Sequence, residues 1–213
     1  MGTGKGLFRP EHPINEALTR VFDLLLLNLL WLFFCIPILT MGTAYAALYT
    51  VTLSWMRGEE VPVVKTFFAA FRKNLKQGIW LTVVFLTLFL ILVWDLHLTG
   101  MLPRSYGSIL YGVILVLLAA VLAAAGYAFP LLARFENPVM KQLGNAWRLA
   151  AAHLPQTILL TALHAAPALW FLISPETFMT VTFLWGVFGT AVTEYICSWI
   201  LAGIFHKLEG VEK

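Results

Sequence analysis

The feature that most constrains this chain is a succession of long apolar runs, at residues 21–56, 79–96, 106–133, 158–173 and 178–205. A helix of about 20 apolar residues spans about 30 Å of hydrocarbon and satisfies its own backbone hydrogen bonds, which lipid cannot do. Of the 213 residues, 60 % are apolar and only 12 % are charged, about half the charge of an ordinary soluble domain. The sequence therefore predicts an all-α fold, a polytopic transmembrane helical bundle that forms a single membrane domain over residues 1–213.

Turn signals divide the apolar runs into about six transmembrane helices, which we expect to form three hairpins. Residues 21–56 are too many for one crossing, and Pro37 followed by Gly42 predicts a turn inside the run. The three hairpins are then residues 21–56, 78–133 and 155–205. The run at 21–39 loosely resembles a cleavable leader, but it exceeds the usual apolar core of about 7–15 residues, so we expect the first helix to be retained.

Two basic amphipathic helices are predicted between the hairpins, at residues 57–77 and 134–154. Their apolar side chains recur at helical spacing: Val64, Phe67, Phe68, Phe71 and Leu75 in the first, and Val139, Leu143, Trp147 and Leu154 in the second. Six cations are candidates for contact with the membrane surface or a partner: Lys65, Arg72, Lys73, Lys76, Lys141 and Arg148. The two segments align at a constant offset, which fits either an internal repeat or two unrelated basic surface helices.

The distribution of Lys and Arg predicts the orientation. Of the 14 such residues, all but Arg104 fall on one side of a six-helix topology. By the positive-inside rule, the N-terminal segment 1–20, both amphipathic helices and the tail 206–213 are cytoplasmic. The lipid bilayer, including its anionic headgroups, is the first expected partner.

Several short motifs resemble the YesL-like family of bacterial integral membrane proteins, a domain of unknown function. The N-terminal motifs are Asn28-Leu29-Leu30-Trp31, Pro37-Ile38-Leu39-Thr40-Met41-Gly42, Ala47-Leu48-Tyr49, Arg57-Gly58-Glu59, and Phe67-Phe68 with Phe71, Asn74 and Gln77. A later part of the chain is similar to the family's second cytoplasmic segment, at residues 130–137, Asn145-Ala146 and Leu154-Pro155. The resemblance implies a multi-pass protein of the bacterial cytoplasmic membrane. Because such genes often lie beside those of carbohydrate ABC transporters, it also implies an association with permease or ATPase subunits.

Glu194 is the main candidate for chemistry inside the membrane. It lies about twelve residues, or about 18 Å, from the cytoplasmic end of the last apolar run, and His164 lies near the middle of the preceding antiparallel helix. An ionisable group costs about 2.5–3.5 kcal/mol at mid-bilayer on insertion scales. We therefore expect Glu194 to have a functional or structural role. The pair can form a substrate or proton site, or Glu194 can be a hydrogen-bonded residue that fixes helix packing.

Other residue types predict structure rather than chemistry. Cys35 and Cys197 have no nearby CxxC or His partner in the sequence, so we expect packing residues, no metal site and no cofactor. Asn28 is expected to hydrogen-bond between helices, and Gly126, Gly186 and other small residues to permit close helix approach. The chain has no recognisable catalytic motif and no dense basic cluster for nucleic acid, which predicts neither an enzyme nor a nucleic-acid-binding protein.

Three functions remain as hypotheses, and the sequence leaves the oligomeric state open. The first is a non-enzymatic accessory or regulatory subunit associated with carbohydrate ABC-type transport, which follows from the family resemblance alone. The second is a small autonomous carrier or channel with Glu194 and His164 on its path. The third is a membrane-bound sensor or assembly factor that acts through the basic helices.

Overall fold

The fold of the chain was obtained as a computed structural model that describes residues 13–101 and 103–211. These residues are helical and contain no strand. The elements are α1 (Pro13–Cys35), η1 (Ile38–Thr40), α2 (Met41–Met56), α3 (Val63–Thr99), α4 (Arg104–Arg134), α5 (Val139–Ala152), α6 (Leu154–Ile173), α7 (Phe178–Leu184), the π-helical turn η2 (Trp185–Gly189) and α8 (Thr190–Val211). The all-α prediction is confirmed for this part of the chain. The predicted N-terminal segment 1–20 ends early, because α1 begins at Pro13, a residue type favoured in a first helical turn; residues 1–12 and 212–213 lie outside the described residues.

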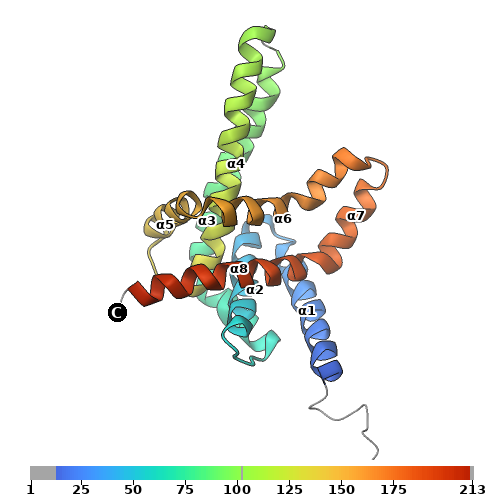
Figure 1. Cartoon of the computed structure of the whole chain (residues 1–213), viewed down its shortest axis with the longest axis vertical. Coiled ribbons are helices and arrows are strands. Elements are labelled where there is room, and N and C mark those ends of the chain that lie inside the picture. The colour runs from blue at the N-terminus through green and yellow to red at the C-terminus, as the bar shows by residue number, and fades with distance from the viewer. Residues whose placement is uncertain (1–12, 102, 212–213) are drawn as a thin grey trace, which may run out of the picture.

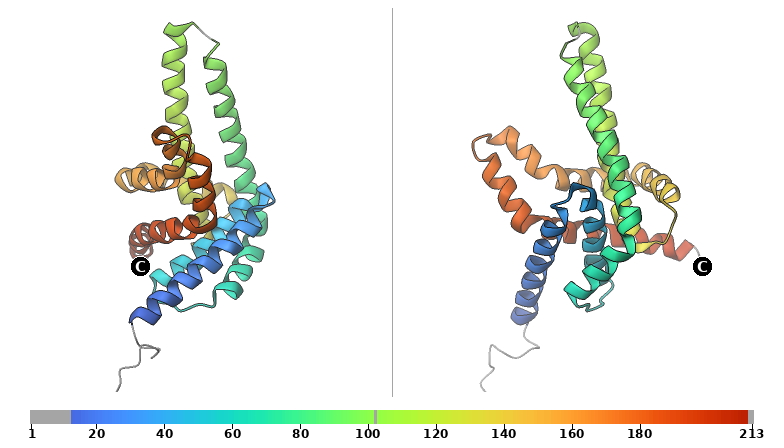
Figure 2. Two further views of the ribbon diagram at one scale, coloured as in Figure 1. Left: turned by 90° about the vertical axis from the view of Figure 1, so that its right-hand side faces the viewer. Right: turned by 180° about the vertical axis from the view of Figure 1, so that it is seen from behind.

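Two long hairpins dominate the shape. Helices α3 and α4 run side by side, and their tip projects beyond the rest of the molecule, whereas α6 and α8 run across their direction (Figures 1 and 2). Among the described residues, five helical stretches are long and apolar enough to cross a membrane: α1, α3, α4, α6 and the continuous stretch Phe178–Gly210. This supports a membrane protein, but the predicted six-crossing topology is not confirmed. The missing crossing is α2, whose 16 residues extend only about 24 Å.

Helix α2 is the centre of the fold. Twelve of its sixteen residues are buried, and it contacts α1, α3, α4 and α8. Its sequence explains this position, because Gly, Ala, Ser and Thr predominate around Leu48 and Tyr49 and leave no charged face. A short helix surrounded by longer ones need not match the thickness of the bilayer by itself.

Two glycines allow α2, α3 and α4 to approach closely. A Cβ atom added at Gly42 would lie 2.3 Å from side-chain atoms of Phe129 and Thr82, and one at Gly78 would lie 2.8 Å from the Cα of Thr43. The Gly42 N–H also donates to the Thr82 hydroxyl over 3.1 Å. Gly126 and Gly186 were also expected to permit close approach, but a Cβ added at either position would meet no atom within 4 Å, so neither contact requires a glycine.

The first predicted amphipathic helix is not a separate element. Residues 63–77 are continuous with the apolar run that follows, so α3 is one helix of 37 residues. Part of its apolar face meets protein: Phe67 and Phe71 are buried and pack on Phe34 of α1, whereas Val64 and Phe68 are exposed. The apolar spacing was expected to face the membrane surface, but its buried members pack on α1.

The second predicted amphipathic helix exists as α5, with a different buried face. Gln142 and Ala146 are fully buried, whereas Trp147 and Leu154 are exposed. The small side chain of Ala146 permits contact with α4, and Gln142 donates to the Ala128 carbonyl of that helix over 3.5 Å. The predicted apolar stripe is therefore rotated, because α5 packs on α4 through its small residues.

Candidate functional site around Glu194

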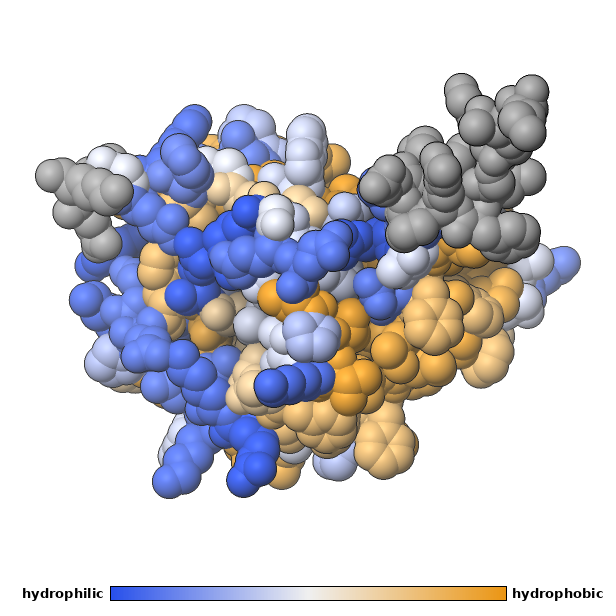
Figure 3. All heavy atoms as spheres, turned by 90° about the horizontal axis from the view of Figure 1, so that it is seen from below, coloured by the Kyte–Doolittle hydropathy of each residue, from blue (hydrophilic) through white to orange (hydrophobic). Residues whose placement is uncertain are grey.

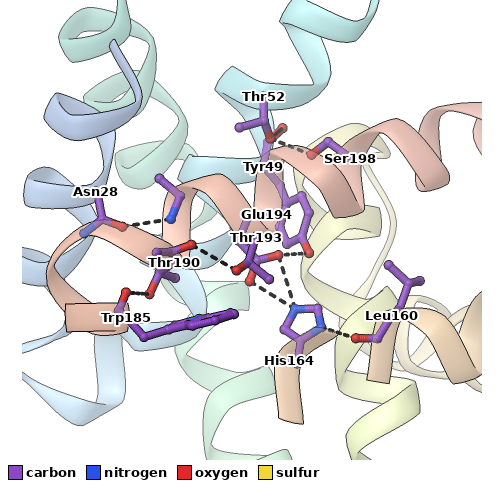
Figure 4. A network of polar contacts seen from close by, with 12 residues as sticks. Asn28, Tyr49, Thr52, Leu160, His164, Trp185, Thr190, Thr193, Glu194 and Ser198 are labelled. Atoms are coloured by element: carbon purple, nitrogen blue, oxygen red, sulfur yellow. Dashed lines mark hydrogen bonds and ion pairs between the residues drawn. The ribbon is translucent and has the colours of Figure 1, made fainter. Parts of the chain in front are cut away.

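Glu194 is a buried carboxylate in the interior of the fold. It lies on α8, and 1 % of its surface is exposed. Its two oxygens are bound by side chains from two other helices, Tyr49 of α2 and His164 of α6 (Figure 4). The predicted pairing of Glu194 with His164 is thus present, and Tyr49 completes the group; we call these three residues the Glu194 triad.

The imidazole of His164 is oriented by two contacts. Its Nδ1 lies 2.7 Å from the Leu160 carbonyl, and its Nε2 lies 3.0 Å from Oε1 and 3.2 Å from Oε2 of Glu194. A carbonyl oxygen only accepts, so Nδ1 must carry a hydrogen. The contact between Nε2 and the carboxylate therefore contains one shared proton, either on the imidazole of a charged pair or on the carboxyl group of a neutral pair.

Tyr49 holds the other side of the carboxylate. Its hydroxyl donates to Oε2 of Glu194, and one turn further along α2 the Thr52 hydroxyl lies 2.6 Å from that of Ser198 on α8. The two contacts fasten α2 to α8 along one face of each helix. Sequence analysis did not select Tyr49, although it ends one of the motifs that resemble the YesL-like family.

A π-helical turn directly precedes α8, the helix that carries Glu194. Between α7 and α8, the Thr190 N–H bonds to the carbonyl of Trp185, five residues back. Asn28 of α1 occupies the opening that results: its amide donates to the carbonyls of Gly186 and Val187, at 2.8 and 2.5 Å, and accepts from the Ala191 N–H at 2.8 Å. The expected role of Asn28 as a link between helices has a physical cause, which is to satisfy backbone groups that the π turn releases.

A cavity of about 380 Å³ lies beside the triad, between α2, α3, α4 and α6. Tyr49 and His164 are on its wall, and most of the remaining lining is apolar or aromatic, including Phe85, Phe129 and Leu122. Leu122, one of the lining residues, is 42 % exposed. The volume of the cavity falls within the range of about 300–1,000 Å³ that small-molecule sites occupy.

Cys197 lies next to the triad, three residues after Glu194 on α8. It is fully buried on α8, and its Sγ, a ring nitrogen of His164 and a carboxylate oxygen of Glu194 all lie within 4.8 Å of one another. The contact joins α6 to α8, so a search for local cysteine and histidine spacing cannot find it.

The six predicted surface cations are all exposed. Lys73 pairs with Glu136, and this contact lowers the pKa of Glu136 below its usual value. Viewed from the lower end of Figure 1, hydrophilic side chains gather mainly over the side where α5 and the end of α8 lie, and hydrophobic side chains cover the opposite side (Figure 3). None of these cations belongs to the Glu194 triad.

Comparison with known proteins gives a resemblance to one family and no activity. Residues 24–96 match the model of a family described as "Protein of unknown function, DUF624". The chain is also similar to an uncharacterized protein, YesL of Bacillus subtilis (strain 168), at 26 % identity over 170 residues, which cover 78 % of this chain and 79 % of that protein. No solved structure matches the chain. Both matches confirm the resemblance to the YesL-like family.

Proposed function

We propose that this chain, a YesL-like membrane protein, binds a small amphipathic molecule within the bilayer and acts as a carrier for it, without catalysing a reaction. One observation carries the proposal: Tyr49 and His164 lie on the wall of a mainly apolar cavity, whose other polar lining residues are Tyr45, Thr82 and Thr161. Apolar pockets with a few convergent polar groups are typical of small-molecule sites.

The lining of the cavity indicates the chemistry of the ligand. Phe85, Phe89 and Phe129 favour an apolar body. The Tyr49 hydroxyl donates to Glu194 and can still accept a hydrogen bond from one polar end, whereas Nε2 of His164 can bond that end when it exchanges its contact with Glu194. A sugar, with hydroxyl groups on every side, would leave most of them without partners against this wall, and each such group is costly to bury. The site therefore suits a molecule with one hydrogen-bonding end, such as a long-chain alcohol, and it does not suit a carbohydrate.

Glu194 contributes by holding the polar end of the site in one arrangement. It lies behind Tyr49 and His164 and bonds both of them. The proton shared between Glu194 and His164 can move toward either partner when a ligand approaches, which lets the imidazole change from donor to acceptor.

Photolabelling in proteoliposomes tests this function. The probe is a medium-chain alcohol that carries a diazirine, and the adducts are mapped by mass spectrometry. We expect labelling of peptides from α2, α3, α4 or α6, and a loss of at least tenfold when the cavity is filled by Ala123→Trp. Ala119→Trp is the matched control, because Ala119 lies one turn earlier on α4 and is exposed on the outer surface.

The triad is tested in the same experiment. Tyr49→Phe and His164→Phe keep an aromatic ring and remove the polar group, so we expect several-fold weaker labelling of the cavity peptides. Equal labelling of wild type, Ala123→Trp and Ala119→Trp would contradict the proposal, because the probe would then be reporting only lipid-exposed surface.

A second candidate is the accessory role in carbohydrate ABC-type transport, with permease or ATPase subunits as partners. The exposure of all six predicted contact cations supports it, because exposed cations can meet anionic headgroups or an acidic partner surface; of the six, Lys73 already pairs with Glu136. This role requires both termini and the basic residues to be cytoplasmic, as proposed from the loop charges. Crosslinking in native membranes tests it: a permease or ATPase should be recovered with wild type and lost when Lys65, Arg72 and Lys76 are changed to Gln.

A further inference from the structure

Three side chains of metal-binding types lie close together beside the cavity, and one of them, His164, is on its wall. A ring nitrogen of His164, a carboxylate oxygen of Glu194 and the Sγ of Cys197 lie within 4.8 Å of one another. Glu194 and Cys197 are three residues apart on α8, and so share a helix face, while His164 is supplied by α6. Glu194 and Cys197 are 1 % and 0 % exposed, which distinguishes the group from the acidic clusters that are common on protein surfaces.

We propose that His164, Glu194 and Cys197 form a binding site for one zinc-class divalent ion. Zinc takes nitrogen, oxygen and sulfur ligands at about 2.0–2.3 Å, and sites with three protein ligands keep a fourth position open. Ligand atoms on such an ion lie about 3–4 Å apart. The donors therefore need only side-chain adjustment to close on an ion.

The groups around these donors already have the arrangement that metal ligands require. A ligating histidine donates its other N–H to a carbonyl or carboxylate, which fixes the free nitrogen toward the metal. Here the Nδ1–H of His164 donates to the Leu160 carbonyl over 2.7 Å, so Nε2 is the nitrogen that faces Glu194. The Tyr49 hydroxyl donates to the carboxylate of Glu194, as outer-shell partners of ligating carboxylates do.

Charge also favours a divalent ion at this position. One carboxylate and one thiolate balance the two positive charges of Zn²⁺, so the occupied site is neutral in a low-dielectric interior. Binding releases two protons to solvent: the thiol proton of Cys197 and the proton shared by Glu194 and His164. No oxidant or further reactant takes part.

The fourth position of the ion would face the cavity, because His164 lies on the cavity wall. A hydroxyl or carboxylate at the polar end of a bound molecule is then the natural fourth ligand. The inference deepens the proposed function and rests on it only for the identity of this fourth ligand. The assignment of the three protein ligands does not depend on the proposed function.

Cobalt titration of the full chain tests the site. The protein is purified in mild detergent with a tag other than polyhistidine, stripped with EDTA and titrated with Co²⁺, which reports thiolate ligation by a near-ultraviolet charge-transfer band. We expect one ion per chain, with the band abolished by Cys197→Ser. Cys35→Ser is the matched control, because Cys35, the only other cysteine of the sequence, lies on α1 away from these donors, and it should leave the band unchanged.

Further variants keep the test informative if Cys197→Ser fails to fold. Glu194→Gln should weaken Co²⁺ binding at least tenfold. Tyr49→Phe, which removes only a hydroxyl, should weaken it by about 10–100-fold, the range for outer-shell groups. Zn²⁺ should displace the bound cobalt. Absence of the band in folded wild type, or equal dependence on Cys35 and Cys197, would overturn the site. Photolabelling of EDTA-stripped protein separates the two proposals. Labelling of the cavity peptides in a protein that does not bind cobalt would overturn the metal site alone. Cobalt binding by a protein whose cavity is not labelled would overturn the carrier function alone.

Discussion

Removal of the Asn28 side chain amide should destabilise the fold far more than its size suggests. Asn28 makes three hydrogen bonds to backbone groups at the π turn, and hydrogen bonds between membrane helices contribute about 0.6 kcal/mol each on average. Asn28→Ala should therefore lower the free energy of unfolding by about 2 kcal/mol. The loss would be larger if the freed carbonyls of Gly186 and Val187 find no water, because a buried unsatisfied group costs about 1–3 kcal/mol.

Steric trapping or denaturant titration in mixed micelles, followed by circular dichroism, measures this change. Leu29→Ala is the control, since Leu29 adjoins Asn28 on α1, is 54 % exposed and reaches no polar group at the turn. Asn28→Asp should also destabilise the fold, because a carboxylate keeps the contact with the Ala191 N–H but opposes the two carbonyls. A loss below about 0.5 kcal/mol for Asn28→Ala, or a loss equal to that of Leu29→Ala, would refute the view that Asn28 supports the π turn.

Two further predictions concern other parts of the fold. In unfolding measurements of the same kind, Gly78→Ala should destabilise the fold by about 1–3 kcal/mol, because its Cβ would meet the Thr43 backbone at 2.8 Å. Gly112→Ala is the control and should stabilise the fold by up to about 1 kcal/mol, because a Cβ there has no atom within 4 Å. Equal effects of the two substitutions would contradict the close helix crossing at Gly78. The hydrogen bond from Arg57 lowers the pKa of Glu59, so the ion pair should persist as pH falls below the usual glutamate value and be lost only below the lowered pKa. NMR titration should show the pKa of Glu59 rising in Arg57→Gln, and an unchanged value would exclude the contact.

The pairing of Glu194 with His164 was accessible from sequence because both residues lie deep in consecutive apolar helices. A short turn makes such helices antiparallel neighbours, and ionisable groups at similar depth then find one another. Tyr49 was not accessible in this way, because its contact with Glu194 joins α2 to α8 across 145 positions of the chain. The contact of Cys197 with His164 was not accessible for the same reason, since it joins α8 to α6, although the spacing of three residues from Glu194 is visible in the sequence.

The amphipathic segments show a different limit of sequence patterns. The spacing of Phe67 and Phe71 predicted a helix with one apolar face at the membrane surface, but apolar spacing alone does not distinguish lipid from a neighbouring helix. Phe34 of α1 supplies that partner. The π turn at 185–189 likewise has no simple sequence signature, and the role of Asn28 becomes clear only when the backbone groups that it bonds are known.

A double-mutant cycle between Glu194 and His164 tests the central claim most directly, because both proposed sites depend on this contact. The free energies of unfolding are compared for wild type, Glu194→Gln, His164→Leu and the double variant in the same micelles. Residues in direct contact show coupling energies of about 0.5–3 kcal/mol, and we predict a value in this range. The loss of unfolding free energy in the double variant should therefore be smaller than the sum of the losses in the two single variants. Strictly additive losses would contradict the contact and, with it, the assignment of a polar site at the wall of the cavity.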